Sequence, residues 1–151
     1  MGAVVYNAPF ARNPTEQGAW FRVMNDLIVA ALGCGLTRVV VGLVNPTLSD
    51  YAGDWHQEVA HQAEAADGVR QGTLWASYNH FFRDVFVDLA AKLDAVNVGT
   101  GQTLLDQSLL TWTQESGHHT HDLHDAVVVG FGSAGGRLNT GIAVDYRNIS
   151  S

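Results

Sequence analysis

The chain has 151 residues, of which 46% are hydrophobic and 15% charged, and its formal net charge is −7 at pH 7. A chain of this length buries roughly 68–70% of its unfolded surface, so the composition predicts one folded domain and excludes a disordered chain. Only eight Lys and Arg side chains are present, so we expect no nucleic-acid partner. No apolar run reaches the roughly 18 residues that span a bilayer, so we expect no transmembrane segment.

The first predicted element is a helix that begins after Asn13. Asn13 is a typical N-cap, Pro14 favours the first helical position and Glu16 completes a capping box. Apolar residues then recur at helical spacing until Gly33 and Gly35 end the helix; they are Trp20, Val23, Met24, Leu27, Ile28 and Ala31. Cys34 follows, and we expect it to be a small buried side chain.

Residues 36–44, LTRVVVGLV, are a β-branched apolar run typical of a strand covered on both faces. Residues 45–68 are rich in Asn, Pro, Asp and Gly and predict an irregular or partly helical excursion, and long loops of this kind are often functional. A second helix is predicted from about Thr73 to Ala95, and His80 within it is interpreted as a packing or surface residue. Its apolar face comprises Leu74, Tyr78, Phe81, Phe82, Val85, Leu89 and Leu93.

The last third of the chain predicts strands separated by turns. NVGTGQT, residues 97–103, is a turn; LLDQSLLTWT, residues 104–113, is a second buried strand; AVVVGFG, residues 126–132, is a third; and IAVDY, residues 142–146, is a short last one. GFGSAGG lacks the Lys-Ser/Thr pair of a phosphate-binding loop and is interpreted as a tight turn. Strands alternating with long helices predict an α/β layered fold with a largely parallel sheet, in which ligands bind beyond the carboxyl ends of the strands.

The first candidate site is Asp54-Trp55-His56 with Glu58 and His61. A carboxylate and an imidazole two residues apart in an extended segment can approach one cation, and His61 joins them if the chain turns after His56. The alternative is a solvated loop.

The second candidate site follows the predicted strand that ends near Thr113. It comprises Glu115, His118, His119, His121, Asp122, His124 and Asp125, in a stretch from Leu93 to Gly136 that contains no Lys or Arg. In an extended stretch His119 and His121 point the same way and His118 points opposite, so at most two or three of these histidines converge on one ion. The alternative is a pH-sensitive polar loop without a metal.

The order of these segments resembles the C-terminal part of the domain of unknown function 1552 family over residues 21–141. The resemblance is carried by the strand LTRV, by LLDQSLL followed by ESG, and by HTHD followed by GSAGG. That family is found in bacterial proteins, often exported, and is similar to the domain of unknown function 1501 family and to the alkaline phosphatase and sulfatase superfamily.

The resemblance implies an alkaline-phosphatase-like, three-layer α/β sandwich with metal ions beyond the strand ends. Asp54 and His56 match the superfamily's first pair of ligands, Glu115 falls at the Asp of the second pair, and His119 or His121 matches the late His. His61 is a further candidate ligand, Asp122 and His124 lie in the surrounding shell, and the implied cofactor is a divalent ion, Zn, Ca or Mg.

The function that the resemblance implies is metal-dependent hydrolysis of a phosphoric or sulfuric ester, with a small or polymeric anionic ester as substrate. Ser116 stands where a second-site His is expected, and the superfamily's nucleophile lies in an N-terminal region that does not match this chain. We therefore expect a partial domain that requires the remainder of a secreted or periplasmic parent polypeptide. The alternative is a non-catalytic extracellular or periplasmic binding or structural domain that retains at most one metal.

Overall fold

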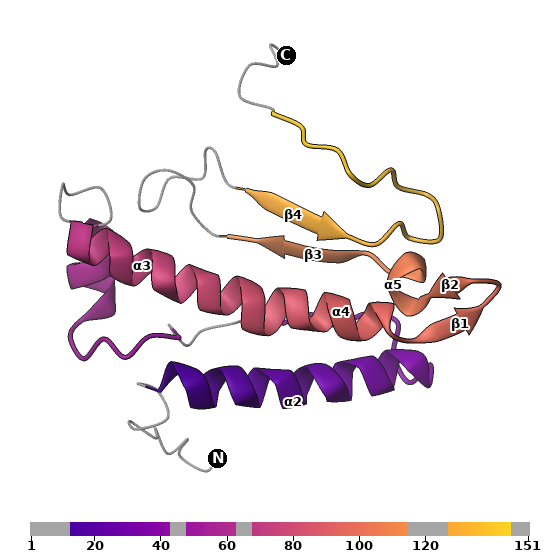
Figure 1. The fold of residues 1–151 in the computed structure, drawn as a ribbon, viewed down its shortest axis with the longest axis horizontal. Helices are drawn as coiled ribbons and strands as arrows, with labels where there is room; N and C mark the ends of the chain where they lie inside the picture. Colours follow the sequence, from indigo (N-terminus) through magenta and orange to yellow (C-terminus); the bar gives the residue numbers. More distant parts are fainter. Residues whose placement is uncertain (1–12, 43–47, 63–67, 115–126, 146–151) are drawn as a thin grey trace. The chain divides into compact units, whose positions relative to one another are not determined.

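The computed structural model describes residues 13–42, 48–62, 68–114 and 127–145 (Figure 1). The chain divides into two compact units, Met1–Lys92 and Leu93–Ser151. In chain order the elements are α2 (Pro14–Gly33), η1 (Trp55–Val59), η2 (Ala60–Gln62), α3 (Gly68–Phe81), η3 (Phe82–Val87), α4 (Asp88–Asp94), β1 (Asn97–Gly99), β2 (Gln102–Thr103), α5 (Leu104–Gln107), β3 (Leu110–Thr113) and β4 (Val128–Phe131). None of the helices within these ranges is long and apolar enough to cross a membrane.

Helix α2 begins and ends where the sequence predicts. The side chain of Asn13 accepts a hydrogen bond from the backbone N–H of Glu16 at 3.1 Å, and Pro14 occupies the first turn. At the other end Gly35 adopts φ +70°, and the N–H of Leu36 returns to the carbonyl of Ala31 at 2.9 Å. A left-handed glycine that closes the last carbonyls is a common helix terminator, so both local signals are confirmed.

The apolar positions of α2 are not its most buried ones. Gln17, Gly18, Phe21 and Asn25 are buried, whereas Trp20, Val23 and Leu27 are exposed. The buried stripe is therefore largely polar or small, and it faces the second long helix of this unit.

The second helix is continuous from α3 through η3 to α4, so residues 68–94 are helical throughout (Figure 1). This confirms the predicted helix from Thr73 to Ala95 and extends it by five residues at its start. Its middle, η3, is a π-helical segment of six residues. Wide turns of this kind are rare and often lie at functional sites.

The expected three-layer α/β sandwich with a largely parallel sheet is wrong. Within the described ranges the strands form two antiparallel two-stranded sheets, β1 with β2 and β3 with β4, and no parallel pair. In the second sheet Leu110 pairs with Phe131 and Thr113 with Val128. The predicted strand over residues 126–132 is thus confirmed as β4, but it pairs antiparallel with β3, whereas the prediction was a largely parallel sheet.

Two predicted strands are wrong wherever the structure describes their residues. Residues 36–42 form no strand and expose Leu36 (82%) and Val41 (90%), and residues 142–145 form none either. A β-branched run needs a partner strand to supply its ladder of hydrogen bonds, and neither segment has one in the part of the chain that the structure describes. Cys34, at the head of the first segment, is exposed, so the expectation of a buried side chain is also wrong.

The predicted strand over residues 104–113 is split between α5 and β3. Thr103 and Asp106 form a reciprocal capping box, in which each side chain accepts a hydrogen bond from the other's backbone N–H. This local arrangement stabilises the short helix α5, and the strand β3 begins only at Leu110. The predicted turns are confirmed: residues 97–103 form the β1–β2 hairpin, and Gly132 adopts φ +84° directly after β4.

Candidate functional site

The loop of residues 48–62 holds three of the predicted site residues: Asp54, His56 and His61. Asp54 caps η1, because its Oδ1 accepts a hydrogen bond from the N–H of Gln57 at 3.2 Å and its carbonyl accepts one from Glu58 at 2.8 Å. The carboxylate of Asp54 therefore starts the turn that carries the histidines. This capping role was not part of the sequence prediction.

His56 and His61 come together. The two Nε2 atoms lie 3.0 Å apart, and the rings are edge to face with centroids 4.5 Å apart and an interplanar angle of 86°. His56 lies in the π-helical segment η1 and His61 in the 3-10 turn η2 that follows it directly, and the two turns together bring residues five apart to the same side. The chain thus turns after His56 in the way that the prediction for His61 required.

Tyr51 and Glu58 brace the same loop. The Tyr51 hydroxyl donates to Glu58 Oε2 at 2.5 Å, and this bond to a carboxylate raises the pKa of Tyr51 above its usual range. Tyr51 also packs edge-on against Trp55 at 6.3 Å between centroids. A Cβ at Gly53 would lie 2.9 Å from the Tyr51 hydroxyl and would collide with Glu58 Oε2, so a larger residue there would displace the ends of these two side chains.

The second predicted cluster, Glu115, His118, His119, His121, Asp122, His124 and Asp125, lies outside the described residues. Among the residues that are described, no three His, Cys, Asp or Glu side chains gather as a metal-binding group. The site that the structure shows is therefore the histidine pair, with Asp54 at the start of its turn.

A second polar centre surrounds Asp84, whose side chain is only 4% exposed. The Arg22 Nη2 atom lies 2.5 Å from Asp84 Oδ1, Arg83 contacts both carboxylate oxygens at 3.0 Å, and the Nδ1 atom of His80 lies 3.1 Å from Oδ2. The Arg83 guanidinium, followed by His80 and Arg22, holds the pKa of Asp84 well below its usual range. Asp84 is therefore a buried carboxylate that stays ionised because cations surround it.

The same network joins α2 to η3. Asn25 Nδ2 donates to the carbonyl of Val85 and to Asp88 Oδ2, both at 2.9 Å. Lys92 Nζ donates to the carbonyl of Arg22 at 2.7 Å and lies 2.7 Å from Asp26 Oδ1. Gly18 gives Asp84 room, because a Cβ there would lie 3.2 Å from Oδ2. Polar contacts thus fix the position of the helix that carries His80.

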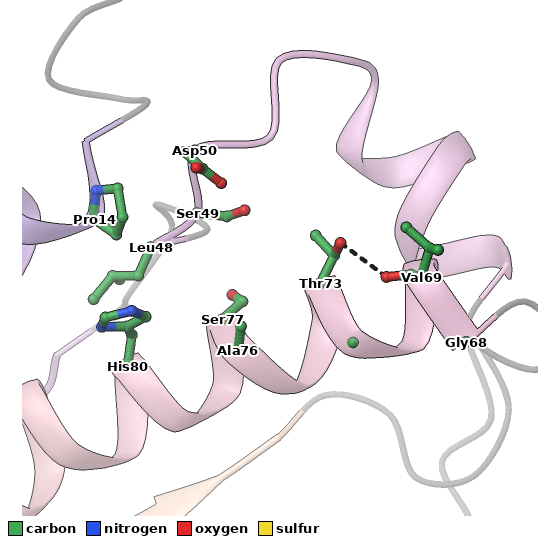
Figure 2. A pocket seen from close by; sticks show the side chains of 11 residues that line it. Pro14, Leu48, Ser49, Asp50, Gly68, Val69, Thr73, Ala76, Ser77 and His80 are labelled. Carbon is green, nitrogen blue, oxygen red and sulfur yellow. Dashed lines mark hydrogen bonds between the residues drawn. The ribbon is translucent and has the colours of Figure 1, made fainter.

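His80 also lines a pocket of about 450 Å³ between the start of α2, the loop at Leu48 and the first three turns of α3 (Figure 2). The lining residues are Pro14, Leu48, Ser49, Asp50, Gly68, Val69, Gly72, Thr73, Ala76, Ser77 and His80. Leu48 is fully buried although its φ is +42°, a strained value for a branched side chain, and Ser49 and Ser77 are also buried. The pocket therefore has a buried floor and an open rim.

No protein-family model, curated protein or solved structure matches the chain. The functional argument therefore rests on the two arrangements in this unit, the His56–His61 pair and the pocket beside His80.

The sequence interpretation missed Asp84 and the role of His80. The spacing of His80 and Asp84, four residues apart on one helix, together with Arg83, was the signal that could have shown the pair. The contact with Arg22 had no local signal, because that residue lies 62 positions earlier.

Proposed function

We propose that this chain binds a divalent transition-metal ion through the Nε2 atoms of His56 and His61. The observation that carries the proposal is their separation of 3.0 Å. Two metal–nitrogen bonds of about 2.0–2.1 Å span about 2.9 Å when they meet at a right angle and about 3.3 Å at a tetrahedral angle. The two imidazoles thus already lie at a separation that one ion accepts.

The chemistry of the ligand atoms narrows the choice of ion. Imidazole nitrogen suits zinc, copper and nickel, whereas calcium and magnesium prefer oxygen ligands. Of the three ions expected from the sequence, zinc therefore fits His56 and His61 best. Asp54 and Glu58, the nearby carboxylates, already accept hydrogen bonds from Gln57 and Tyr51, which favours a two-histidine site over a carboxylate cage.

A second candidate function is the hydrolysis of a phosphate or sulfate ester, as the family resemblance implies. Two histidine ligands would leave further positions on a bound ion for a substrate oxygen. The chemistry that a bound ion supplies there is polarisation of the ester oxygen. The competing proposal is a binding domain without catalysis, and turnover of an aryl phosphate or aryl sulfate by the zinc-loaded chain distinguishes the two.

The test of metal binding is a zinc titration of the chain followed by NMR of the histidine rings. We expect saturable changes at the His56 and His61 rings, and a loss of one zinc ion per chain in His56→Ala and in His61→Ala. Gln57→Ala is the matched control, because it removes an exposed side chain from the same turn and keeps the backbone N–H that Asp54 accepts. Equal zinc stoichiometry and affinity in the wild type and both histidine variants would overturn the proposal.

A further inference from the structure

The pocket beside His80 offers a set of groups suited to hydroxyl-bearing ligands (Figure 2). Three hydroxyl side chains line it, Ser49, Thr73 and Ser77, together with the carboxylate of Asp50 and the imidazole of His80. Among the lining residues that the structure describes, Asp50 is the one acidic side chain, and none is a Lys or Arg. An anionic ligand would meet repulsion from the Asp50 carboxylate.

The hydroxyls that line the pocket are oriented by neighbouring backbone. The Ser49 Oγ atom accepts a hydrogen bond from the N–H of Tyr51 at 3.2 Å, so its own O–H is the group that it can donate. Thr73 Oγ1 donates to the carbonyl of Val69 at 3.0 Å, so its lone pairs are the groups that can accept (Figure 2). The pocket thus presents a donor from one wall and an acceptor from the other.

His80 and Asp50 add further polar groups. When His80 donates through Nδ1 to Asp84, its Nε2 atom carries a lone pair; when Nδ1 instead accepts from Arg83 Nη2, which lies 3.0 Å away, Nε2 carries the proton and donates. The Asp50 carboxylate points toward the pocket in the close view. Leu48, Val69 and Ala76 supply the apolar part of the lining. A molecule that both donates and accepts hydrogen bonds along a carbon frame satisfies this combination.

We propose that this pocket binds a neutral, hydroxyl-rich molecule of monosaccharide size. Its volume of about 450 Å³ lies in the range of small-molecule sites, which is roughly 300–1,000 Å³. Each ligand hydroxyl can donate to Asp50 or Thr73 and accept from Ser49. The carbon frame packs against Val69 and Ala76. This site is separate from the histidine pair and does not depend on a bound metal.

The test is NMR titration of the chain, in buffer with chelator, against glycerol, myo-inositol and D-glucose. Inorganic phosphate and ethylammonium serve as the charged comparison probes. We expect saturable shifts at the amides of Ser49, Thr73 and Ser77 with at least one ring-sized polyol, in the millimolar range. Thr73→Val should weaken this binding about three- to tenfold, the loss expected from one neutral hydrogen bond.

Thr37→Val is the matched control, because the Thr37 hydroxyl also donates to a carbonyl, that of Val39 at 2.8 Å, but does not line the pocket. It should leave polyol binding unchanged. Asp50→Asn should weaken the binding of the polyols and strengthen the binding of phosphate. Shifts that rise linearly with every probe, stronger binding of phosphate or ethylammonium than of the polyols by the wild type, or equal affinity in Thr73→Val and the wild type would each overturn the proposal.

Discussion

Replacement of Asp84 by Asn is the most direct test of the polar contact between α2 and η3. The substitution keeps the size of the side chain and removes its charge. Hydrogen bonds to charged groups contribute about 1.5–3 kcal/mol each when they are protected from water. The Arg22 and Arg83 side chains are 50% and 65% exposed, so water compensates much of their loss. We expect the free energy of unfolding to fall by about 2–3 kcal/mol at pH 7.

The loss of unfolding free energy in Asp84→Asn should depend on pH in a defined direction. Arg83, His80 and Arg22 lower the pKa of Asp84 in the folded chain. A carboxyl with a lowered native pKa stabilises the fold fully above its unfolded value, near 3.9, and that contribution is lost as the pH falls toward the native pKa. The advantage of the wild type over Asp84→Asn should therefore shrink below about pH 4, by at most about 1.4 kcal/mol per pH unit.

The assay is urea unfolding followed by tryptophan fluorescence, at pH 7 and at several values between pH 4 and pH 2. Asp26→Asn is the control, because Asp26 is 65% exposed and its ion pair with Lys92 lies at the surface. Exposed pairs contribute about 0–1 kcal/mol, so this variant should unfold close to the wild type. If Asp84→Asn unfolds at the wild-type urea concentration at pH 7, or if its deficit stays constant down to pH 2, the reasoning is refuted.

Three further predictions concern the local geometry. Gly53→Ala should displace the Glu58 carboxylate from the Tyr51 hydroxyl, so the pKa of Tyr51 should be lower in the variant than in the wild type; identical tyrosine titrations would contradict this prediction. Asn25→Ala should cost about 1–3 kcal/mol in urea unfolding, since it removes two donors from a buried contact; an unchanged midpoint would count against it. Zinc at a hundredfold excess over its dissociation constant should stabilise the wild type by about 2.7 kcal/mol; an equal thermal shift in His56→Ala would argue against histidine ligation.

The elements that the sequence predicts correctly are those whose cause is local. Asn13 caps α2 through a bond to Glu16 three residues away, and Gly35 ends it through its own φ. The long helix of residues 68–94 follows from composition and spacing over many turns. The convergence of His56 and His61 was predicted only on the condition of a turn, and the π-helical segment η1 followed by the 3-10 turn η2 supplies that turn.

The errors arise where burial was inferred from apolar character alone. The run that contains Val39, Val40 and Val41 is as apolar as a buried strand, but burial needs a neighbouring surface, and all three side chains are exposed. Residues 104–107 are apolar at their start, but the reciprocal hydrogen bonds of Thr103 and Asp106 make a helical turn lower in free energy than an extended segment. Strand pairing depends on distant partners, and the pattern of a single segment does not contain that information.

The polar contact between the two long helices also holds the His80 side chain that lines the pocket. Helix packing usually relies on apolar ridges, but the contact between α2 and η3 rests on a buried carboxylate and a buried amide, Asp84 and Asn25. Asp84 contacts two side chains with different positions. Arg22 belongs to α2, and His80, whose Nδ1 atom contacts Asp84, lines the pocket. Because the Asp84 carboxylate contacts both Arg22 and His80, a substitution that weakens the helix contact should also release the His80 ring. Asp84→Asn should therefore weaken polyol binding as well as stability, whereas Asp26→Asn should change neither by a comparable amount.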